Sequence, residues 1–418
     1  MVNGGAGLAR HQGQVVFIPH TAVGDVVSCR VVKAKKNFLQ AEVVEILKPA
    51  TLRRKPICPV AGDCGGCQWQ HLPYPEQLSW KESLFRESLI RRCGSEPDRI
   101  LPIIPAADEW HYRSRVQIKC HNSPAGFATG FYRPKSHLVV SVEQCPIIPP
   151  ELNNLLTQLR HIINHTPYAS HIQQLDFAVD DKKKCSVVIH YSGNDSASLA
   201  GLLQGEKLAA DLLIKVSGRS ELIKVCGDGA MQISVDSPPI QLNYAVGGFT
   251  QINLQQNLAL VDNISGLAEL TGSEQVLDLY CGMGNFSLPL ARRAKHVIGI
   301  EESVLSIEMA RQNSRLNEIK NVDFYSQSAE GALTFFSQQQ AIDLLVLDPP
   351  RSGAAVTMKE LLEKPVKKVL YVSCDPQTLA RDLSLLVSGG YELVSSQPFD
   401  MFPQTHHCES VTLLNYHS

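Results

Sequence analysis

The stretch at residues 277–291, LDLYCGMGNFSLPLA, decides the fold of the chain. An apolar run that ends in a glycine turn and continues as a helical pattern is typical of the first strand, turn and helix of a nucleotide-binding α/β sheet. Gly282 and Gly284 permit a close backbone approach to a ligand at the carboxyl end of the strand. Ser287 stands where a third glycine would complete the G-x-G-x-x-G fingerprint, which argues against a dinucleotide ligand.

From about residue 245 onward, apolar segments alternate with helical spacers. Seven of these segments read as strands: VLDLYCG, HVIGIEE, VDFYSQ, DLLVLDPP, KKVLYVSC, ELVSSQPF and VTLLNYH. They predict a multi-domain α/β chain whose C-terminal part is a doubly wound, Rossmann-like sheet with a late hairpin. Glu301 ends the second strand, 17 residues beyond Gly284, where a carboxylate accepts hydrogen bonds from both ribose hydroxyls. A methyl donor, S-adenosylmethionine, therefore fits better than NAD; the alternative is a structural turn followed by a helix-capping acid.

The length of 418 residues exceeds one hydrophobic core, so two or three domains are expected. The net charge of -2 gives no argument for a nucleic-acid partner, but residues 30–55 concentrate Lys and Arg, as an RNA-binding surface or a merely solvated face would. No secretion signal and no apolar run near the ~20 residues that cross a bilayer is present, so a cytoplasmic protein without a membrane partner is expected. In that reducing compartment the twelve cysteines are interpreted as ligands, nucleophiles or core thiols.

Residues 1–50 contain short strands, QVVFIPH, DVVSCRVVKAK and FLQAEVVEIL, separated by turn residues, which predicts a small β-barrel of the oligonucleotide-binding kind. The order GGAGLAR, VVFIPHTAVGDVV, AEVVEIL resembles a TRAM domain, a small RNA-binding barrel. Such a domain usually has a strand before its glycine turn, whereas this sequence begins at the turn, so an incomplete barrel is expected. Residues 112–240 mix the strands RVQIKC, LDFAVD and SVVIHY with the helical pattern ELNNLLTQLRHIINH, which predicts a separate α/β or α+β domain.

A cysteine cluster follows the first domain. Cys58, Cys64 and Cys67 lie within CPVAGDCGGCQWQ, and Cys145 could supply a fourth thiolate from a distant loop. Two metal centres suit such ligands, a structural zinc or an iron–sulfur cluster, and thiolate chemistry alone does not separate them. The spacing differs from the C-x3-C-x2-C of radical enzymes, so radical chemistry is not inferred. Three structural cysteines that happen to be close in sequence are the alternative.

Three segments fall at the carboxyl ends of the fourth, fifth and sixth predicted strands, the edge at which open α/β sheets bind ligands: LDPPRSGA, YVSCDPQTLARDL and FDMFPQTHHCESVTLL. Cys374 is followed by Asp375, Pro376 and a helical pattern. At such a junction the helix dipole is expected to lower the pKa of the thiol and favour a reactive thiolate. A core cysteine at the end of an apolar strand is the alternative interpretation.

A thiolate at this place serves one particular methyl transfer. Carbon-5 of uracil is a weak nucleophile, but addition of a thiolate to carbon-6 makes carbon-5 an enolate carbon that attacks a sulfonium methyl group. A base must then remove the carbon-5 proton, and Glu409 in HHCESV is the best-placed candidate. His406 and His407 are alternative bases ranked below it, and the alternative for Glu409 itself is a surface acid before the last strand.

Five motifs, CGGCQWQ, LDLYCGMGNF, LDPPRSG, VSCDPQTLARDL and DMFPQTHHCES, occur together and in this order. The chain resembles, over essentially its whole length, the RNA uracil-5-methyltransferases, most nearly the branch that carries an iron–sulfur cluster and acts on large-subunit ribosomal RNA. The resemblance implies that Cys374 is the nucleophile, Glu409 the base and Phe249 an aromatic that stacks on the flipped base. It implies cofactor contacts from Gln251, Tyr280, Asn285, Glu301 and Asp348, with Ser328 where the family usually has Asn. It also implies a structural [4Fe–4S] cluster, in preference to zinc, held by Cys58, Cys64, Cys67 and Cys145.

Domain boundaries and partners complete these expectations. Residues 1–50 are expected to form the TRAM-like barrel, and residues 51–74 with 96–244 the cluster domain; the resemblance implies that residues 75–95 join residues 245–418 in the methyltransferase domain. A monomer that modifies 23S ribosomal RNA rather than transfer RNA is expected. A DNA cytosine-5 methyltransferase is disfavoured, because those enzymes carry the cysteine after the fourth strand, which here ends in Asp-Pro-Pro-Arg. A non-catalytic RNA-binding or assembly protein is the alternative from another class.

Overall fold

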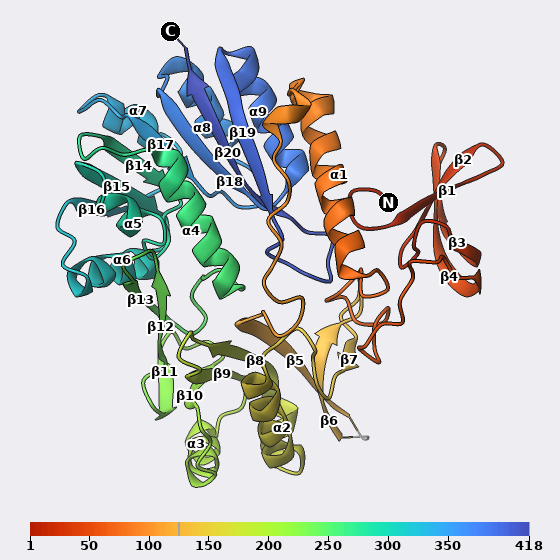
Figure 1. Cartoon of the computed structure of the whole chain (residues 1–418). Helices are drawn as coiled ribbons and strands as arrows, with labels where there is room; N and C mark the ends of the chain where they lie inside the picture. Colours follow the sequence, from red (N-terminus) through yellow and green to blue (C-terminus); the bar gives the residue numbers. More distant parts are fainter. Residues whose placement is uncertain (124–125, 418) are drawn as a thin grey trace.

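The computed structural model describes residues 1–123 and 126–417, arranged as three large sheets and a two-stranded one around a common junction (Figure 1). The N-terminal sheet stands apart at one side, the central sheet lies below, and the C-terminal sheet with its helices forms the largest part (Figure 1). Within the described residues, no helix is both long and apolar enough to cross a bilayer.

The N-terminal sheet has the strand order β1-β2-β4-β3, built from β1 (Gly7–His11), β2 (Gln14–Ile18), β3 (Val26–Ala34) and β4 (Phe38–Lys48). The three strands expected from the sequence are present. The strand β1, GLARH, was not among the expected strands, because four of its five side chains are exposed and show no alternation. Gln12 and Gly13, both with positive φ, form the two-residue turn that pairs β1 with β2. In the part of the chain that the structure describes, the sheet ends at β1 and β3 without closing, as expected for an incomplete barrel.

The central sheet has the order β11-β10-β9-β8-β5-β6-β7, antiparallel except for the parallel pair β9 and β10. Its strands are β5 (Arg115–Ser123), β6 (Gly126–Tyr132), β7 (Val139–Ser141), β8 (Ile172–Val179), β9 (Cys185–Tyr191), β10 (Asp211–Val216) and β11 (Leu222–Cys226). Its helices are α2 (Pro150–Asn164) and α3 (Ser196–Gly205), with the short 3₁₀ helix Pro167–His171. The hairpin of β12 (Ala230–Val235) and β13 (Ile240–Ala245) leads from this sheet toward the C-terminal part.

The C-terminal sheet has the order β16-β15-β14-β17-β18-β20-β19, parallel except for β20. All seven expected strands are present: β14 (Gln275–Leu279), β15 (His296–Glu301), β16 (Val322–Ser326), β17 (Leu344–Leu347), β18 (Lys368–Ser373), β19 (Tyr391–Phe399) and β20 (Glu409–Tyr416). The central strands are mostly apolar because helices cover both faces. The expected doubly wound sheet with a late hairpin is confirmed.

Two helical layers cover this sheet. The helices α4 (Leu254–Ala268), α5 (Ser287–Ala291) and α6 (Val304–Leu316) share an apolar core with one face of the strands. The opposite face carries α7 (Ala332–Ser337), α8 (Ala355–Glu363) and α9 (Pro376–Ser388). The long helix α1 (Tyr74–Cys93), followed by the 3₁₀ helix Pro97–Arg99, also packs here, since Phe85 and Leu89 share a core with Leu379 and Leu383 of α9. In Figure 1, α1 lies between the N-terminal sheet and the C-terminal sheet.

Candidate active site

The glycine turn after β14 has a backbone that most side chains avoid. Gly282 and Gly284 have φ of 56° and 93°, and Tyr280 has φ of 64°. A Cβ atom on Gly284 would lie 3.2 Å from the side chain of Leu288, so this position has little room for a larger residue. A non-glycine residue in the left-handed region is a strained conformation, which folded proteins keep mainly at functional sites.

A small pocket opens over this turn. Its lining includes five of the residues that the sequence singled out for cofactor or base contact: Phe249, Gln251, Tyr280, Asn285 and Asp348. Thr250, Cys281, Gly282, Met283 and Phe286 complete the lining. Three separate segments, the loop before α4, the glycine turn after β14 and the end of β17, therefore meet at one edge of the sheet.

Two predicted cofactor positions lie outside this lining. Glu301 ends β15, the strand next to β14, and accepts a hydrogen bond from the Ser303 backbone at 2.8 Å. Its charge reaches the glycine-turn strand, because it contributes to raising the pKa of Asp278. Ser328 follows β16, is exposed, and accepts a hydrogen bond from the Glu330 backbone at 3.2 Å.

Polar contacts hold the pocket side chains in place. Asn285 of the glycine turn and Asn257 of the helix α4 exchange two amide hydrogen bonds of 2.9 Å each. The Gln251 amide donates to Asp348 at 3.5 Å. Burial raises the pKa of Asp348 to about 7. Burial also raises the pKa of Asp278 to about 7, with nearby Asp348 and Glu301 adding to the effect. A cation bound in this pocket would relieve the mutual repulsion of these carboxylates.

Cys374 and Glu409 come together through the pairing of β18 with β20. The antiparallel register pairs Ser373 with Ser410, so one further step along both strands sets Cys374 opposite Glu409. Glu409 is 3% exposed, and its Oε1 has no hydrogen-bond partner among the described residues. Burial, followed by the charge of Asp348, raises the pKa of Glu409 well above its ordinary value, while Arg351 acts in the opposite direction. A buried carboxyl with an unpaired oxygen is free to exchange a proton with a bound ligand.

The expected lowering of the Cys374 pKa is wrong. Burial, with the carboxylates of Glu409 and Asp348 adding to it, raises the pKa of the thiol to about 12, while the cationic Arg351 and a backbone hydrogen bond act in the opposite direction. The N-terminus of α9 gives little help because Asp375 already caps it. The Asp375 carboxylate accepts hydrogen bonds from the backbone N–H groups of Gln377 and Thr378 at 2.9 Å each. Its negative charge offsets the positive end of the helix dipole.

The two histidines ranked below Glu409 are neutral imidazoles near neutral pH. Burial lowers the pKa of His406 to about 4 and the pKa of His407 to about 3, and the cations Lys81 and Arg351 contribute to both shifts. Their rings lie 4.1 Å apart, centroid to centroid.

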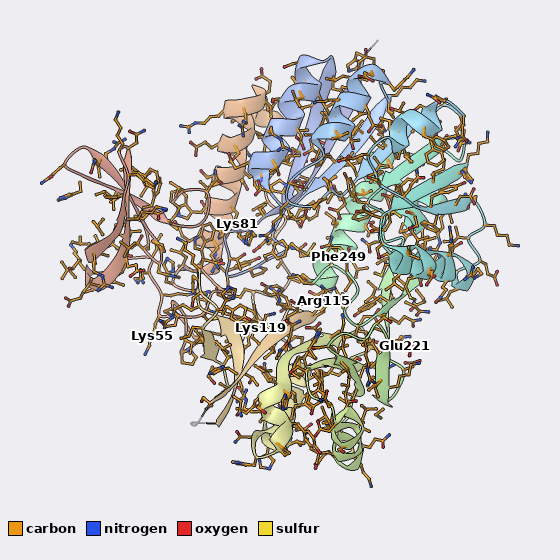
Figure 2. All side chains as sticks on the ribbon, turned by 180° about the vertical axis from the view of Figure 1, so that it is seen from behind. Lys55, Lys81, Arg115, Lys119, Glu221 and Phe249 are labelled. Atoms are coloured by element: carbon orange, nitrogen blue, oxygen red, sulfur yellow. The ribbon has the colours of Figure 1, made fainter. Side chains whose placement is uncertain are left out.

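Phe249 is 66% exposed and belongs to the loop between β13 and α4. The central sheet holds this loop: the Arg115 guanidinium donates to the Gly248 carbonyl, and the Ser114 backbone donates to the Ile252 carbonyl at 2.7 Å. Figure 2 shows Phe249 and Arg115 close together where the central sheet meets α4. An exposed ring on a fixed loop beside the pocket can stack on a base without losing other contacts.

The segment that contains Cys58, Cys64 and Cys67, called the cysteine loop, is bonded to the end of β6. Gly65 donates a backbone hydrogen bond to the Tyr132 carbonyl at 3.0 Å, and a Cβ atom there would lie 2.9 Å from the same oxygen. Burial raises the pKa of Cys67 to about 12, and the charges of Cys145, Cys64 and Cys58 add to the shift. The four thiols are thus electrostatic neighbours, and soft sulfur donors suit zinc or an iron–sulfur cluster. In residues 1–123 and 126–417, however, no group of three or more Cys, His, Asp or Glu is gathered closely enough to hold a metal ion.

Arg351 and Asn257 are two residues of this site that the sequence analysis did not single out. Arg351 directly follows the Asp-Pro-Pro of the fourth strand, and its place beside Asp348 in the motif was the signal for it. Asn257 had no such signal, since an amide four residues into a helical pattern looks like an ordinary surface position.

Comparison with known proteins decides the family. Residues 95–417 match the model of the tRNA (uracil-5-)-methyltransferase family, and residues 3–44 match the TRAM domain. The chain belongs to the tRNA (uracil-5-)-methyltransferase family. The resemblance to RNA uracil-5-methyltransferases and the TRAM-like N-terminal sheet are confirmed, and this methyltransferase uses S-adenosylmethionine.

Its relatives match over nearly the full length. A 23S rRNA (uracil(1939)-C(5))-methyltransferase RlmD of Shewanella amazonensis is 34% identical over 428 residues, covering 98% of this chain and 92% of the relative. The RlmD of Vibrio parahaemolyticus is 31% identical over 412 residues, covering 98% and 93%. The crystal structure of Pyrococcus abyssi tRNA (uracil-54, C5)-methyltransferase with S-adenosyl-L-homocysteine superposes with a TM-score of 0.76 at 23% identity, covering 99% of this chain and 98% of that one. The last similarity confirms the fold of the methyltransferase.

Proposed function

We propose that the enzyme transfers a methyl group from S-adenosylmethionine to carbon-5 of a uridine in 23S ribosomal RNA through a covalent bond to Cys374. The observation that carries this proposal is the pairing of β18 with β20, which sets Cys374 opposite the buried, unpaired carboxyl of Glu409. Both lie within electrostatic reach of Asp348 in the pocket wall. A nucleophile, a base and a cofactor pocket at one sheet edge suit this reaction.

Cys374, Glu409 and Phe249 each have a separate role in the proposed reaction. The Cys374 thiolate forms a bond to carbon-6 of uracil, and the resulting carbon-5 enolate takes the electrophilic methyl group that S-adenosylmethionine supplies on its sulfonium, releasing S-adenosylhomocysteine. Glu409 then accepts the carbon-5 proton, and the electron pair left behind expels the thiolate from carbon-6. Phe249 stacks on the flipped base from the exposed loop before α4.

Charge balance accounts for the high thiol pKa. In the free protein the site holds Cys374, Glu409 and Asp348 with Arg351 as their cation, which keeps the thiol protonated near neutral pH. A sulfonium bound beside Asp348 adds a second positive charge and favours ionisation of all three groups. The nucleophile is therefore activated when the methyl donor is bound, which limits side reactions of the free thiol.

A ribosomal substrate is supported by the relatives that cover nearly the whole chain and are named as 23S rRNA methyltransferases. A transfer-RNA substrate is the second candidate, supported by the name of the structural neighbour from Pyrococcus abyssi. Mapping 5-methyluridine by mass spectrometry in rRNA and tRNA from a deletion strain and from the same strain complemented with the gene tests this choice. Loss of one site in 23S rRNA supports the proposal, and loss confined to tRNA contradicts it.

We also propose that Cys58, Cys64, Cys67 and Cys145 hold a [4Fe–4S] cluster, with zinc as the alternative. The support is the soft donor chemistry and the proximity of the four sulfur atoms, whose thiolate charges would raise one another's pKa and would be neutralised by bound metal cations. Protein purified without oxygen should contain about four iron and four acid-labile sulfide per chain. One zinc per chain without sulfide would assign the alternative metal, and protein without any metal would contradict both.

Activity itself is tested by transfer of tritium from labelled S-adenosylmethionine to unmodified RNA. The wild-type enzyme should label carbon-5 of uridine, whereas Cys374→Ala should label nothing and still bind the cofactor. If neither protein labels RNA but both bind it equally well, the chain is a recognition or assembly scaffold and the proposed function is wrong.

A further inference from the structure

Gln404 lies in the loop between β19 and β20, five residues before Glu409, and is completely buried. Its backbone has a φ of 69°, in the left-handed region that glutamine seldom adopts. Such a conformation costs free energy and persists only where surrounding contacts fix it. The contacts that fix Gln404 all come from outside the C-terminal sheet.

The backbone of Gln404 joins this loop to the cysteine loop and to α1. Its carbonyl accepts hydrogen bonds from the Gln68 and Trp69 backbones at 3.1 Å and 2.9 Å. Its N–H donates to the Gln77 side-chain carbonyl at 2.9 Å. Gln68 and Trp69 directly follow Cys67 in the sequence, so the cysteine loop and the loop of the proposed base share one backbone position.

The side chain of Gln404 adds three more connections. Its carbonyl oxygen accepts from Arg54 at 2.9 Å and from Gln77 at 3.0 Å. Its amide nitrogen donates to Glu109 at 2.9 Å. Arg54 also contacts Glu109 as an ion pair at 3.1 Å. Every polar group of Gln404 is thus bonded to the cysteine loop, α1 or the segments that flank them.

We propose that Gln404 is a positioning residue, which sets Glu409 against the reacting base by fixing its loop to the cysteine loop and α1. The inference rests on the proposed role of Glu409 and deepens it. Lys81 and Tyr112 also bond to this loop, at the Phe402 and Pro403 carbonyls, but Gln404 is the position that joins it to the backbone after Cys67. The ladder of β19 and β20 begins only at Glu409 itself. The cysteine loop thereby contributes to proton removal through backbone contacts, without any contact to the substrate.

Displacement of Glu409 should be recognisable by a covalent protein–RNA adduct. If Glu409 is misplaced, thiolate addition and methyl transfer still proceed, but removal of the carbon-5 proton slows and the methylated protein–RNA adduct accumulates. A general loss of structure gives no adduct, because addition then fails as well. The adduct, visible on a denaturing gel, therefore separates a positioning role from a merely structural one.

The test variant is Gln404→Asn, since asparagine tolerates the left-handed backbone but is too short to reach Arg54, Gln77 and Glu109 together. We expect kcat to fall about 10- to 100-fold, as for an ångström-scale misplacement. We expect the adduct to accumulate, and KM for RNA and for S-adenosylmethionine to stay the same or fall, because the slowed step follows methyl transfer. Gln77→Met, which removes the partner on α1, should act in the same direction. Gln204→Leu, which removes one hydrogen bond to Val225 in the central domain, is the matched control and should behave as wild type.

Each outcome decides one question. A fall in kcat without adduct in both Gln404→Asn and Gln77→Met, or an equal rise in KM for RNA, overturns the positioning role. If Gln404→Asn does not fold, Gln77→Met alone carries the test. Glu409→Gln is measured in parallel with the same RNA: an adduct there but not in the Gln404 and Gln77 variants refutes this inference alone, whereas no adduct in Glu409→Gln refutes the proposed function.

Discussion

Cys374 is surrounded by groups that oppose its ionisation, which gives it a characteristic reactivity. Burial and two carboxylates raise its pKa to about 12, and Arg351 is the cation that acts against them. A raised pKa means that the thiolate fraction at neutral pH is small and grows about tenfold with each pH unit up to about 12. The thiol of the free enzyme is therefore slow to react with electrophiles at neutral pH.

Alkylation of Cys374 by iodoacetamide, followed by peptide mass spectrometry, measures this property. In the free protein the rate should rise steadily from pH 8 to pH 11. Arg351→Met should slow alkylation by about tenfold or less at a given pH, because loss of the cation raises the thiol pKa further. The exposed Cys29 and Cys226 serve as internal references. An alkylation rate that levels off below pH 8 would contradict the assignment of a protonated thiol.

Phe249 carries a prediction that separates substrate binding from folding. Because its ring is 66% exposed, Phe249→Ala should leave the thermal melting temperature unchanged. Loss of stacking should lower kcat/KM for RNA by about 5- to 150-fold, corresponding to about 1–3 kcal/mol. Phe335→Ala, which removes another exposed ring on α7, is the matched control. Equal effects of the two variants would show that Phe249 does not contact the base.

At the level of elements, α1 is tied to the loop of the proposed base by a buried ion pair. Lys81 of α1 contacts Asp400 at 2.5 Å, and both side chains are completely buried. Figure 2 shows Lys81 on the face of α1 toward the C-terminal sheet. Lys81 also donates to the Phe402 carbonyl at 3.0 Å. Phe402 lies two residues before Gln404, so α1 holds the loop at two neighbouring positions, through Lys81 and through Gln77.

Removing one partner of this pair should be costly. Lys81→Met leaves the Asp400 carboxylate buried without its cation and should lower the free energy of unfolding by about 3–5 kcal/mol. The double variant Lys81→Met with Asp400→Asn should recover part of that loss, since no unpaired charge remains. Urea unfolding of the three proteins checks this. A single variant as stable as wild type would show that the pair contributes nothing to the attachment of α1.

The elements that the sequence predicted are those with a strong local pattern. The strands β14, β17 and β18 are mostly apolar, and a parallel sheet covered on both faces favours that composition. The strand β1 has mostly exposed side chains and depends on a turn at Gln12 and Gly13. Its sequence therefore shows no alternation of apolar and polar residues that would predict a strand. The pKa of Cys374 was predicted wrongly, because it depends on carboxylates that approach through folding and on a helix cap already filled by Asp375. Gln404 is outside the reach of sequence reasoning, since its partners lie on four distant segments.

On the scale of the whole molecule, the N-terminal sheet stands at one side (Figure 1), and most side chains of β3 and β4 are exposed or half-buried. Lys33, Lys35 and Lys36 lie in this stretch and are exposed. Their place on a TRAM domain suits contact with RNA phosphates, which is electrostatic and independent of sequence.

Replacement of these three lysines by alanine should weaken RNA binding at low salt and reduce the slope of log affinity against log salt by up to about 2 to 3. The rate of methyl transfer with saturating RNA should stay unchanged, because the lysines are far from the reacting edge in sequence and domain. Alanine replacement of Lys359, Lys364 and Lys367, exposed on the methyltransferase domain, is the charge-matched control. An unchanged salt slope would show that the N-terminal sheet does not contact phosphate.

Trapping the covalent intermediate on RNA that contains 5-fluorouridine tests the role of Cys374 most directly, because fluorine at carbon-5 does not leave as a proton does and the thiolate bond persists. With S-adenosylmethionine, the wild-type enzyme should form a complex that survives denaturation. After nuclease and protease treatment, the Cys374 peptide should carry the nucleotide, which itself bears the methyl group on carbon-5. Cys374→Ser should form no such complex, while Cys408→Ser, which alters the thiol beside Glu409, should still form it. A nucleotide bound to any other residue, or a complex undiminished in Cys374→Ser, would contradict the proposed chemistry.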